Sequence, residues 1–143
     1  MNSRGCVLVV EDDDEVRDLI CSVLADEGYS SLGAENGQGA LALIAGNPPE
    51  VILADVRMPV MDGCAFARAC RKQLGETPII ALTGAEDLSD LADPSLFDAV
   101  LNKPFNLLDL LDIVERHTTR GVTHGVVHRS EKSKQAAWAG GDR

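Results

Sequence analysis

Five consecutive acidic residues, at positions 11–15, are the first group in this 143-residue sequence whose side chains could do chemistry together. A carboxylate at Asp55, a hydroxyl at Thr83 and an ammonium group at Lys103 are further candidates. Carboxylates that meet at one point repel one another, so they need a cation or a proton among them. Oxygen ligands that leave room for water and for a phosphoryl group suit Mg²⁺. The residue types therefore predict a magnesium site.

Phosphoryl transfer is the reaction that this set of side chains could support. A carboxylate can act as a nucleophile toward phosphorus. The transferred group carries spreading negative charge, which a metal ion, a lysine and a hydroxyl can stabilise. The candidates include each of these groups, provided that the fold brings them to one place.

Four continuous apolar runs indicate the strands that would position these residues. They lie at 7–10, 51–54, 79–82 and 99–101. Continuous runs are typical of strands buried on both faces, as in parallel sheets that are covered by helices. A weaker strand is expected at 30–34, after a helix stop at Gly28.

Helices are predicted between these strands. The first begins after a cap at Asp13 or Asp14 and has one apolar stripe with helical spacing. That stripe consists of Val16, Leu19, Ile20, Val23 and Leu24. Further helices are expected at 38–45, 64–73 and 86–92, the last of them short and closed by Pro94. The final helix begins near Asn106, with Leu107, Leu110, Leu111 and Val114 on its inner stripe.

The alternation of strands and helices predicts an α/β protein with a doubly wound, flavodoxin-like (βα)5 fold. We expect a five-stranded parallel sheet in the order 2-1-3-4-5, with helices on both faces. Ligands of such sheets bind beyond the carboxyl ends of the strands. The acidic run, Asp55, Thr83 and Lys103 all follow predicted strands, so they should meet at this edge.

Each candidate also has a simpler explanation when it is taken alone. The acidic run could cap a helix and favour its dipole. Asp55 could be a turn residue, Thr83 an ordinary strand exit and Lys103 a solvated charge. Their joint placement after four different strands is what favours a site.

Charge and hydropathy exclude several classes of protein. The net charge is −10, and residues 1–119 hold 21 acidic residues against 8 Lys and Arg. Such a body would repel nucleic acid, so direct DNA binding is not expected. No apolar run approaches the roughly 18–20 residues of a membrane helix, and the amino-terminal residues lack a secretory pattern. We expect a cytoplasmic protein whose scattered cysteines are small buried hydrophobes, Cys64 and Cys70 in a helix among them.

Four segments, in this order and spacing, resemble the receiver domain of bacterial two-component response regulators. They are VLVVEDDDEVR, ILADVRMPVMDG, PIIALTG and LNKPF. The resemblance covers residues 5–117, and residues 118–143 are expected to be a flexible, mildly basic tail without an output domain. It implies a stand-alone receiver that takes a phosphoryl group from a sensor histidine kinase or a phosphotransfer protein. Its output would be contact with a protein partner or onward phosphorelay, and it would not be an enzyme beyond self-catalysed phosphotransfer and dephosphorylation.

The resemblance also implies roles for the metal-binding residues. Glu11 and Asp12 match the acidic pair, with Asp12 as the more direct Mg²⁺ ligand. Asp55 matches the phosphoacceptor and is a metal ligand as well. Arg57 would contribute its backbone carbonyl to the metal. Gly63 matches the turn glycine that opens the third helix.

Roles for the phosphoryl-binding side of the site follow from the same resemblance. Thr83, which precedes Gly84, matches the hydroxyl that turns toward the phosphoryl group. Lys103 matches the lysine that pairs with that group. The bond between Lys103 and Pro104 matches one that is cis in the family.

Two departures from the family pattern affect how a signal would be transmitted. Val100 stands where the family usually has an aromatic switch residue, so a Thr–aromatic switch of the usual kind is not expected. The stretch 83–103 is also short. Both features resemble an atypical group of single-domain receivers from alphaproteobacteria. We hypothesise that the signal emerges as ordering of 84–97, and that Leu108 and Ile113 contact a partner or a second copy, unless the tail covers them.

Three other functions use similar residues or the same fold. A haloacid-dehalogenase-type phosphatase shares Mg²⁺, Asp, Thr and Lys, but it carries its nucleophile after strand one in a DxD motif. A flavodoxin-type protein shares the fold, but an acidic pocket would repel its flavin phosphate. A degenerate receiver that is never phosphorylated would lack acceptor chemistry that this sequence contains.

Overall fold

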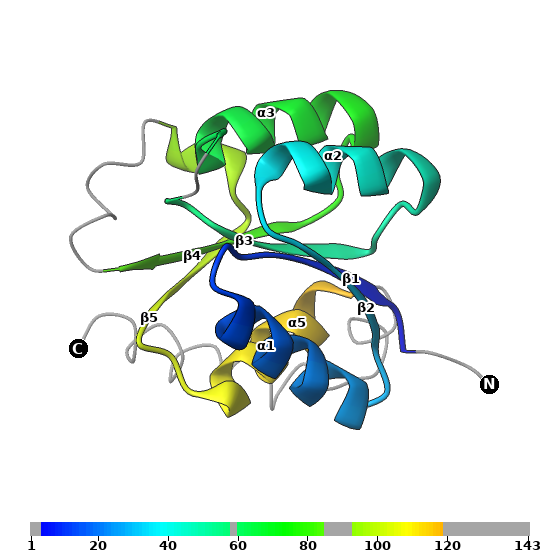
Figure 1. Cartoon of the computed structure of the whole chain (residues 1–143), viewed down its shortest axis with the longest axis vertical. Helices are drawn as coiled ribbons and strands as arrows, with labels where there is room; N and C mark the ends of the chain where they lie inside the picture. Colours follow the sequence, from blue (N-terminus) through cyan, green and yellow to red (C-terminus); the bar gives the residue numbers. More distant parts are fainter. Residues whose placement is uncertain (1–3, 58–59, 85–92, 119–143) are drawn as a thin grey trace.

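Five parallel strands form one sheet in the order β2-β1-β3-β4-β5, as predicted. The computed structural model describes residues 4–57, 60–84 and 93–118 (Figure 1). The strands are β1 (Cys6–Val10), β2 (Ser30–Ala34), β3 (Val51–Asp55), β4 (Ile79–Gly84) and β5 (Ala99–Lys103). The predicted apolar runs are confirmed as strands, and β3, β4 and β5 continue beyond them into polar residues.

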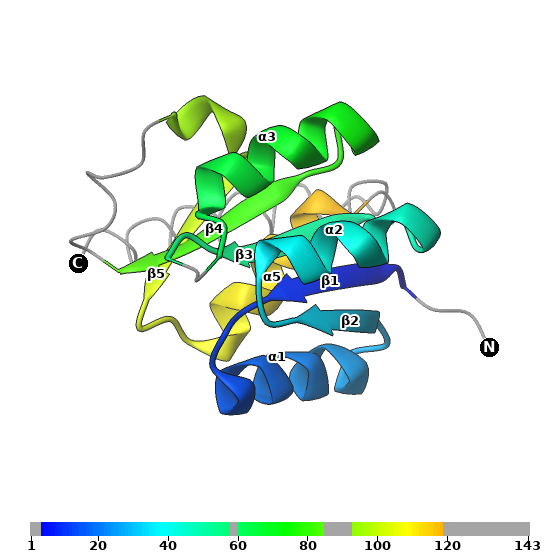
Figure 2. The same cartoon turned by 45° about the horizontal axis from the view of Figure 1, so that its top comes forward.

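Helices cover both faces of the sheet, which explains why the predicted runs in its central strands are continuously apolar (Figures 1 and 2). They are α1 (Asp14–Asp26), α2 (Gly37–Gly46), α3 (Gly63–Leu74) and α5 (Leu107–His117). One cluster of buried side chains joins α2 and α3 to the sheet, and a second joins α1 and α5 to its other face. Alternate residues of β1 divide between the two clusters, since Leu8 belongs to the first and Val9 to the second.

The predicted short helix at 86–92 lies outside the described residues, and so does the predicted tail apart from Thr118. Pro94 opens a short 3₁₀ helix, Pro94–Leu96, before β5. Its position fits the fixed φ and missing N–H of proline, which suit the first turn of a helix.

Polar caps begin the helices where the sequence placed them. The Asp13 carboxylate accepts hydrogen bonds from the backbone N–H groups of Glu15 and Val16, so Asp13 rather than Asp14 is the N-cap of α1. Asn106 caps α5 in the same manner. Gly28 follows the end of α1 with a φ of 93°, a conformation that glycine adopts without steric cost.

The inner face of α5 differs from the prediction. Leu110, Ile113 and Val114 are fully buried, so the prediction that Ile113 lies off the inner stripe and could contact a partner is wrong. The spacing i, i+3, i+4 from Leu110 places Ile113 on the sheet. Leu108 is 76% exposed, as expected, and Leu107 is only half-buried.

The apolar stripe predicted for α1 is also narrower than expected. Ile20 and Leu24 are fully buried, but Leu19 is 51% exposed. Leu19 therefore contributes little to the core, although its spacing matched the stripe. Its exposure makes it a useful reference position on the surface of α1.

The cysteines behave as small hydrophobic residues. All four are free, and Cys64 and Cys70 are buried in α3, as predicted. Burial raises the pKa of the Cys70 thiol to about 12 from an ordinary value of 9.0. The neutral thiol is thus the form that the folded protein favours.

We predict that Cys70 resists alkylation in the folded protein. Iodoacetamide labelling at pH 8, mapped by mass spectrometry, should modify the half-buried Cys21 well before Cys70, and denaturant should remove the difference. Because the pKa is raised, the contribution of Cys70 to stability is present below pH 9 and is lost as the pH rises toward 12. Equal labelling of the two cysteines in the folded protein would contradict this prediction.

Candidate functional site

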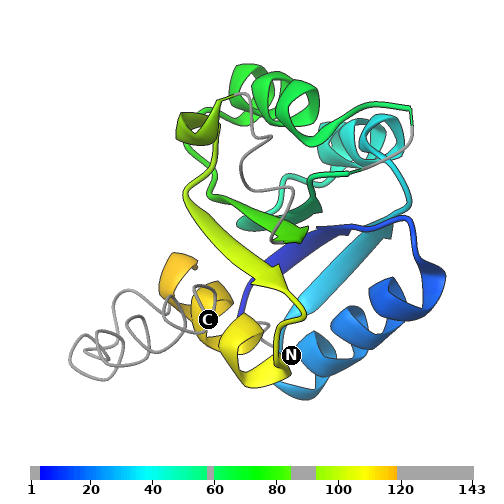
Figure 3. The same cartoon turned by 90° about the vertical axis from the view of Figure 1, so that its left-hand side faces the viewer.

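The register of the sheet brings the predicted site residues to one edge. Figure 3 shows the strands of this sheet from the side. Asp55, the last residue of β3, pairs with Leu82 of β4, and Gly84 at the end of β4 pairs with Lys103 of β5. Glu11 directly follows β1, which lies on the other side of β3. Parallel strands that end together therefore place one carboxylate, then a second, then a hydroxyl and an ammonium group along a single edge.

The ammonium group of Lys103 lies between two buried carboxylates. Its Nζ is 2.8 Å from Oδ2 of Asp55 and 3.3 Å from Oε1 of Glu11. Asp55 is 6% exposed and Glu11 only 2%. The charge of Lys103 therefore offsets part of a repulsion that burial makes strong.

Backbone N–H groups hold the other oxygen of each carboxylate. The N–H of Arg57 donates to Oδ1 of Asp55 at 3.0 Å, and the N–H of Asp13 donates to Oε2 of Glu11 at 3.1 Å. Both carboxylates thus have fixed orientations. Fixed donors of this kind require no reorganisation when charge develops at the site.

For both Glu11 and Lys103, burial and the neighbouring charge of opposite sign shift the pKa in opposite directions. Burial raises the pKa of Glu11, although the N–H of Asp13 and the charge of Lys103 favour its ionised form. Burial alone would lower the pKa of Lys103, but its hydrogen bond to Asp55 and the charges of Asp55 and Glu11 outweigh that effect and raise it. Lys103 therefore keeps its positive charge at neutral pH.

The donor set fits a hard divalent cation. Glu11, Asp12 and Asp55 each offer a carboxylate oxygen, and these three oxygens lie within 4.8 Å of one another. Asp12 is exposed, so a cation could keep several water ligands on that side, as Mg²⁺ prefers. The structure thus brings together the three side chains that were predicted as ligands. For Arg57 it records the N–H contact with Asp55, and the metal-binding role of its carbonyl stays a prediction.

Thr83 lies in the same edge and is 1% exposed. Its hydroxyl donates to the carbonyl of Gly84 at 3.1 Å. Contact between this hydroxyl and a phosphoryl group stays a prediction, and it would require rotation away from Gly84. The peptide bond between Lys103 and Pro104 is cis, as predicted. Val100 is half-buried and packs against the cluster under α2 and α3.

The requirement for glycine at position 63 is steric, which the sequence alone did not show. The N–H of Gly63 donates to the carbonyl of Val56, and a Cβ at this position would lie 2.9 Å from Cα of Val56. The backbone leaving β3 therefore passes too close to the start of α3 for any side chain. Gly63 lets the chain turn directly after the acceptor strand.

Arg17 is a site residue that sequence reasoning missed. Its guanidinium donates to the backbone carbonyl of Glu11 at 2.7 Å and forms an ion pair with Asp14. It therefore connects the first turn of α1 to the acidic segment after β1. The available signal was its position three residues after Asp14, where helical side chains meet.

The fold and the edge together define a class of protein: a doubly wound parallel α/β domain with an acidic, lysine-bridged site at the ends of its strands. A family model for the response regulator receiver domain matches residues 7–115. The chain therefore belongs to the response regulator receiver domain family, as its four segments suggested.

Characterised relatives share this part of the chain. The regulatory protein AtoC of Escherichia coli K12 is 36% identical over 119 residues, which are 81% of this chain and 26% of AtoC. The response regulator MprA of Mycobacterium sp. strain KMS is 38% identical over 107 residues, covering 73% of this chain and 46% of MprA. The chain thus matches between about a quarter and a half of the length of these relatives.

Solved structures confirm the fold. The chemotaxis response regulator CheY4 of Vibrio cholerae matches with a TM-score of 0.72 and 34% identity, over 78% of this chain and 97% of that one. The receiver domain of NtrX from Brucella abortus matches with a TM-score of 0.71 and 28% identity, over 78% and 96% of the two chains. Within the described residues, no helix is both long and apolar enough to cross a membrane.

We predict that Asp12 is required for stabilisation by Mg²⁺. Binding should raise the free energy of unfolding by about 1.4 kcal/mol at a Mg²⁺ concentration of ten times Kd. Thermal melts of Asp12→Asn should lose this response, whereas Asp14→Asn, which changes a neighbouring acid outside the cluster, should keep it. An unchanged response in Asp12→Asn would remove Asp12 from the metal site.

We also predict opposite effects for two glycine substitutions. Gly63→Ala should lower the free energy of unfolding by roughly 1–3 kcal/mol, because the new methyl group meets the backbone of Val56. Gly46→Ala, at the end of α2, meets nothing within 4 Å and should leave stability unchanged or raise it by up to about 1 kcal/mol. Urea denaturation measures both. A stable Gly63→Ala protein would show that the close approach is relaxed in solution.

Proposed function

We propose that this receiver accepts a phosphoryl group on Asp55 from a phosphohistidine, either of a sensor histidine kinase or of a phosphotransfer protein. The observation that carries the proposal is the contact of Lys103 with both Asp55 and Glu11, beside the three clustered carboxylates. Membership of the receiver family supports phosphoryl acceptance in general. The identity of the donor and of the acceptor oxygen are the finer parts of the proposal.

The arrangement suggests how the reaction would proceed. An Asp55 oxygen forms a bond to phosphorus while the bond between phosphorus and the donor imidazole breaks. The N–H of Arg57 holds Oδ1 of Asp55, and the Lys103 ammonium lies on Oδ2. As the phosphoryl group arrives, Lys103 can donate to one of its oxygens without losing its charge. The Thr83 hydroxyl, one strand away, can donate to another.

Mg²⁺ is the metal that we propose for the acidic cluster, with Glu11, Asp12 and Asp55 as its side-chain ligands. When bound, it would neutralise the carboxylates and part of the charge of the phosphoryl group. The backbone carbonyl of Arg57 is a further proposed ligand. Lys103 alone supplies one positive charge for three carboxylates, so the site has need of this additional charge.

The position of the acceptor favours a receiver over an aspartate-nucleophile phosphatase. Asp55 ends β3, whereas the nucleophile of such a phosphatase would follow β1. We therefore propose that catalysis is limited to self-phosphorylation and self-dephosphorylation. A binding role for flavin phosphate is disfavoured by the three carboxylates at the same edge.

We propose that the output is a contact with another protein or onward phosphorelay. The excess of acidic residues in 1–119 supports a protein rather than DNA as the direct partner. Homologues named as DNA-binding regulators, such as NtrC of Salmonella typhimurium, match this chain over only 24% of their length. Stand-alone action, a cytoplasmic location and membership of the atypical group without a switch aromatic stay predictions of the sequence.

We predict that the protein incubated with acetyl phosphate and Mg²⁺ gains the mass of one phosphoryl group. Asp55→Asn, which keeps the shape but removes the nucleophile, should gain none. Asp109→Asn, which changes a half-buried acid of α5 outside the carboxylate cluster, should be phosphorylated like the wild type. Intact-mass spectrometry distinguishes these results. Modification of Asp55→Asn, or no uptake by wild type from acetyl phosphate or from a phosphohistidine donor, would contradict the proposal.

A further inference from the structure

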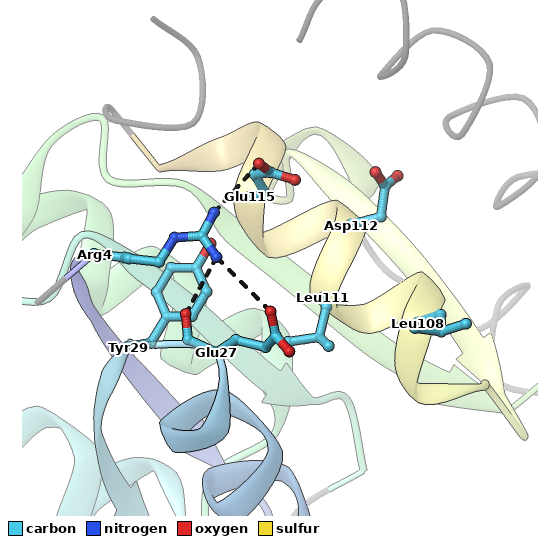
Figure 4. A pocket seen from close by; sticks show the side chains of 7 residues that line it. All are labelled: Arg4, Glu27, Tyr29, Leu108, Leu111, Asp112 and Glu115. Carbon is cyan, nitrogen blue, oxygen red and sulfur yellow. Dashed lines mark hydrogen bonds and ion pairs between the residues drawn. The ribbon is translucent and has the colours of Figure 1, made fainter. Parts of the chain in front are cut away.

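A pocket between α5 and the residues that follow the end of α1 is not used by the acceptor site. Its volume is about 300 Å³, and Figure 4 shows the side chains that line it. Its lining combines one cation, three acids and three residues with large apolar surfaces: Arg4, Glu27, Asp112, Glu115, Tyr29, Leu108 and Leu111. A cavity of this size, at the lower end of the range for ligand pockets, suits one large side chain with a short flanking segment.

Arg4 is held in the pocket by contacts with other lining residues. The Arg4 guanidinium lies 4.8 Å from the centre of the Tyr29 ring and pairs with Glu115 at 3.2 Å, as Figure 4 shows. It also donates to the carbonyl of Glu27. Arg4, the only cation among the described lining residues, is therefore already engaged. A ligand would meet apolar surface with acidic groups around it.

Leu108 exposes a large apolar surface to water beside this pocket. It is 76% exposed on the first turn of α5, and Leu111 lies one turn further along the same helix. Large exposed apolar side chains beside a concave surface are typical of binding sites. An occupant with both an apolar anchor and positive charge would match the lining.

We propose that the pocket binds the carboxyl-terminal segment of this same chain, residues 119–143, with Trp138 as its anchor. The segment carries five Lys and Arg against two acids, a net charge of +3, and it contains the only tryptophan of the protein. Helices α1 and α5 carry seven acids against two arginines, a net charge of −5. Charge and hydropathy are thus complementary between the two surfaces.

The segment 119–143 begins beside the pocket, which favours it over a separate molecule as the ligand. Thr118 caps the end of α5 and donates its hydroxyl to the carbonyl of Glu115, which lines the pocket. The ten steps along the chain from Leu108 to the C-cap Thr118 span about 15 Å. Trp138 lies twenty positions beyond Thr118, so the segment is long enough to return along the helix. A tethered segment meets its site at an effective concentration on the order of millimolar, so a weak contact suffices.

The aromatic residues of the sequence provide a direct test. Trp138 is the only tryptophan, and Tyr29, in the pocket, is the only tyrosine. In the full chain at low salt, Trp138 fluorescence should be less quenched by acrylamide than in a synthetic peptide of residues 119–143. Excitation of Tyr29 should also produce Trp138 emission by energy transfer. High salt should weaken both effects, because part of the attraction is between exposed charges.

Two matched substitutions separate the pocket from the rest of the helical surface. Leu108→Lys should abolish the protection of Trp138, whereas Leu19→Lys, an equally charged change at an exposed leucine of α1 outside the pocket, should preserve it. Circular dichroism should show an unchanged fold in both, since each leucine is exposed. Quenching of the wild type equal to that of the peptide, equal loss in the two variants, or protection that grows with protein concentration would overturn the proposal. The last result would indicate the segment of a second copy.

Discussion

The contact of Lys103 with Asp55 and Glu11 is the interaction on which the acceptor site depends. Two carboxylates that are almost fully buried would repel each other and lose their hydration, and one ammonium group compensates both. Lys103 can do so only because β5 ends level with β4, while β3 and β1 deliver the carboxylates at the same edge. The parallel sheet is therefore the device that brings together charges 92 and 48 positions apart in the chain.

The acidic run shows how neighbouring residues of one type acquire different roles. Glu11 is buried and touches Lys103, and Asp12 is exposed and completes the carboxylate cluster. Asp13 caps α1, Asp14 pairs with Arg17, and Glu15 lies in the first turn, where negative charge favours the helix dipole. Helix capping and metal binding are thus both correct explanations of the run, and they apply to different members of it. Arg17 joins the two functions, because it contacts Asp14 and the carbonyl of Glu11.

Sequence reasoning was most successful where side-chain pattern and backbone structure have the same cause. Strands buried on both faces must be apolar, so all four continuous runs and the order of the sheet were predictable. It was weaker where the backbone continues after the pattern stops: β3 includes Asp55 and β4 includes Thr83, because ladder hydrogen bonds do not require apolar side chains. The error on Ile113 has a related origin. Leu107, Leu108, Leu110, Leu111 and Ile113 offer two overlapping stripes, and only the packing of α5 on the sheet selects one.

Acidic residues are a shared feature of the acceptor site and of the pocket beside α5. The two places lie on either side of the short connection between β5 and α5. A site for Mg²⁺ and a phosphoryl group requires several carboxylates at the strand ends, but the surfaces of α1 and α5 hold more acids than that site uses. These additional acids do not contribute to the hydrophobic core, and their mutual repulsion destabilises the folded state. They do give the α1–α5 surface a preference for cationic segments, and residues 119–143, which follow α5, carry a net charge of +3. Five positions separate Lys103 in the acceptor site from Leu108 at the pocket, so one short connection carries both the residue that would sense the phosphoryl group and the residue that the segment would cover.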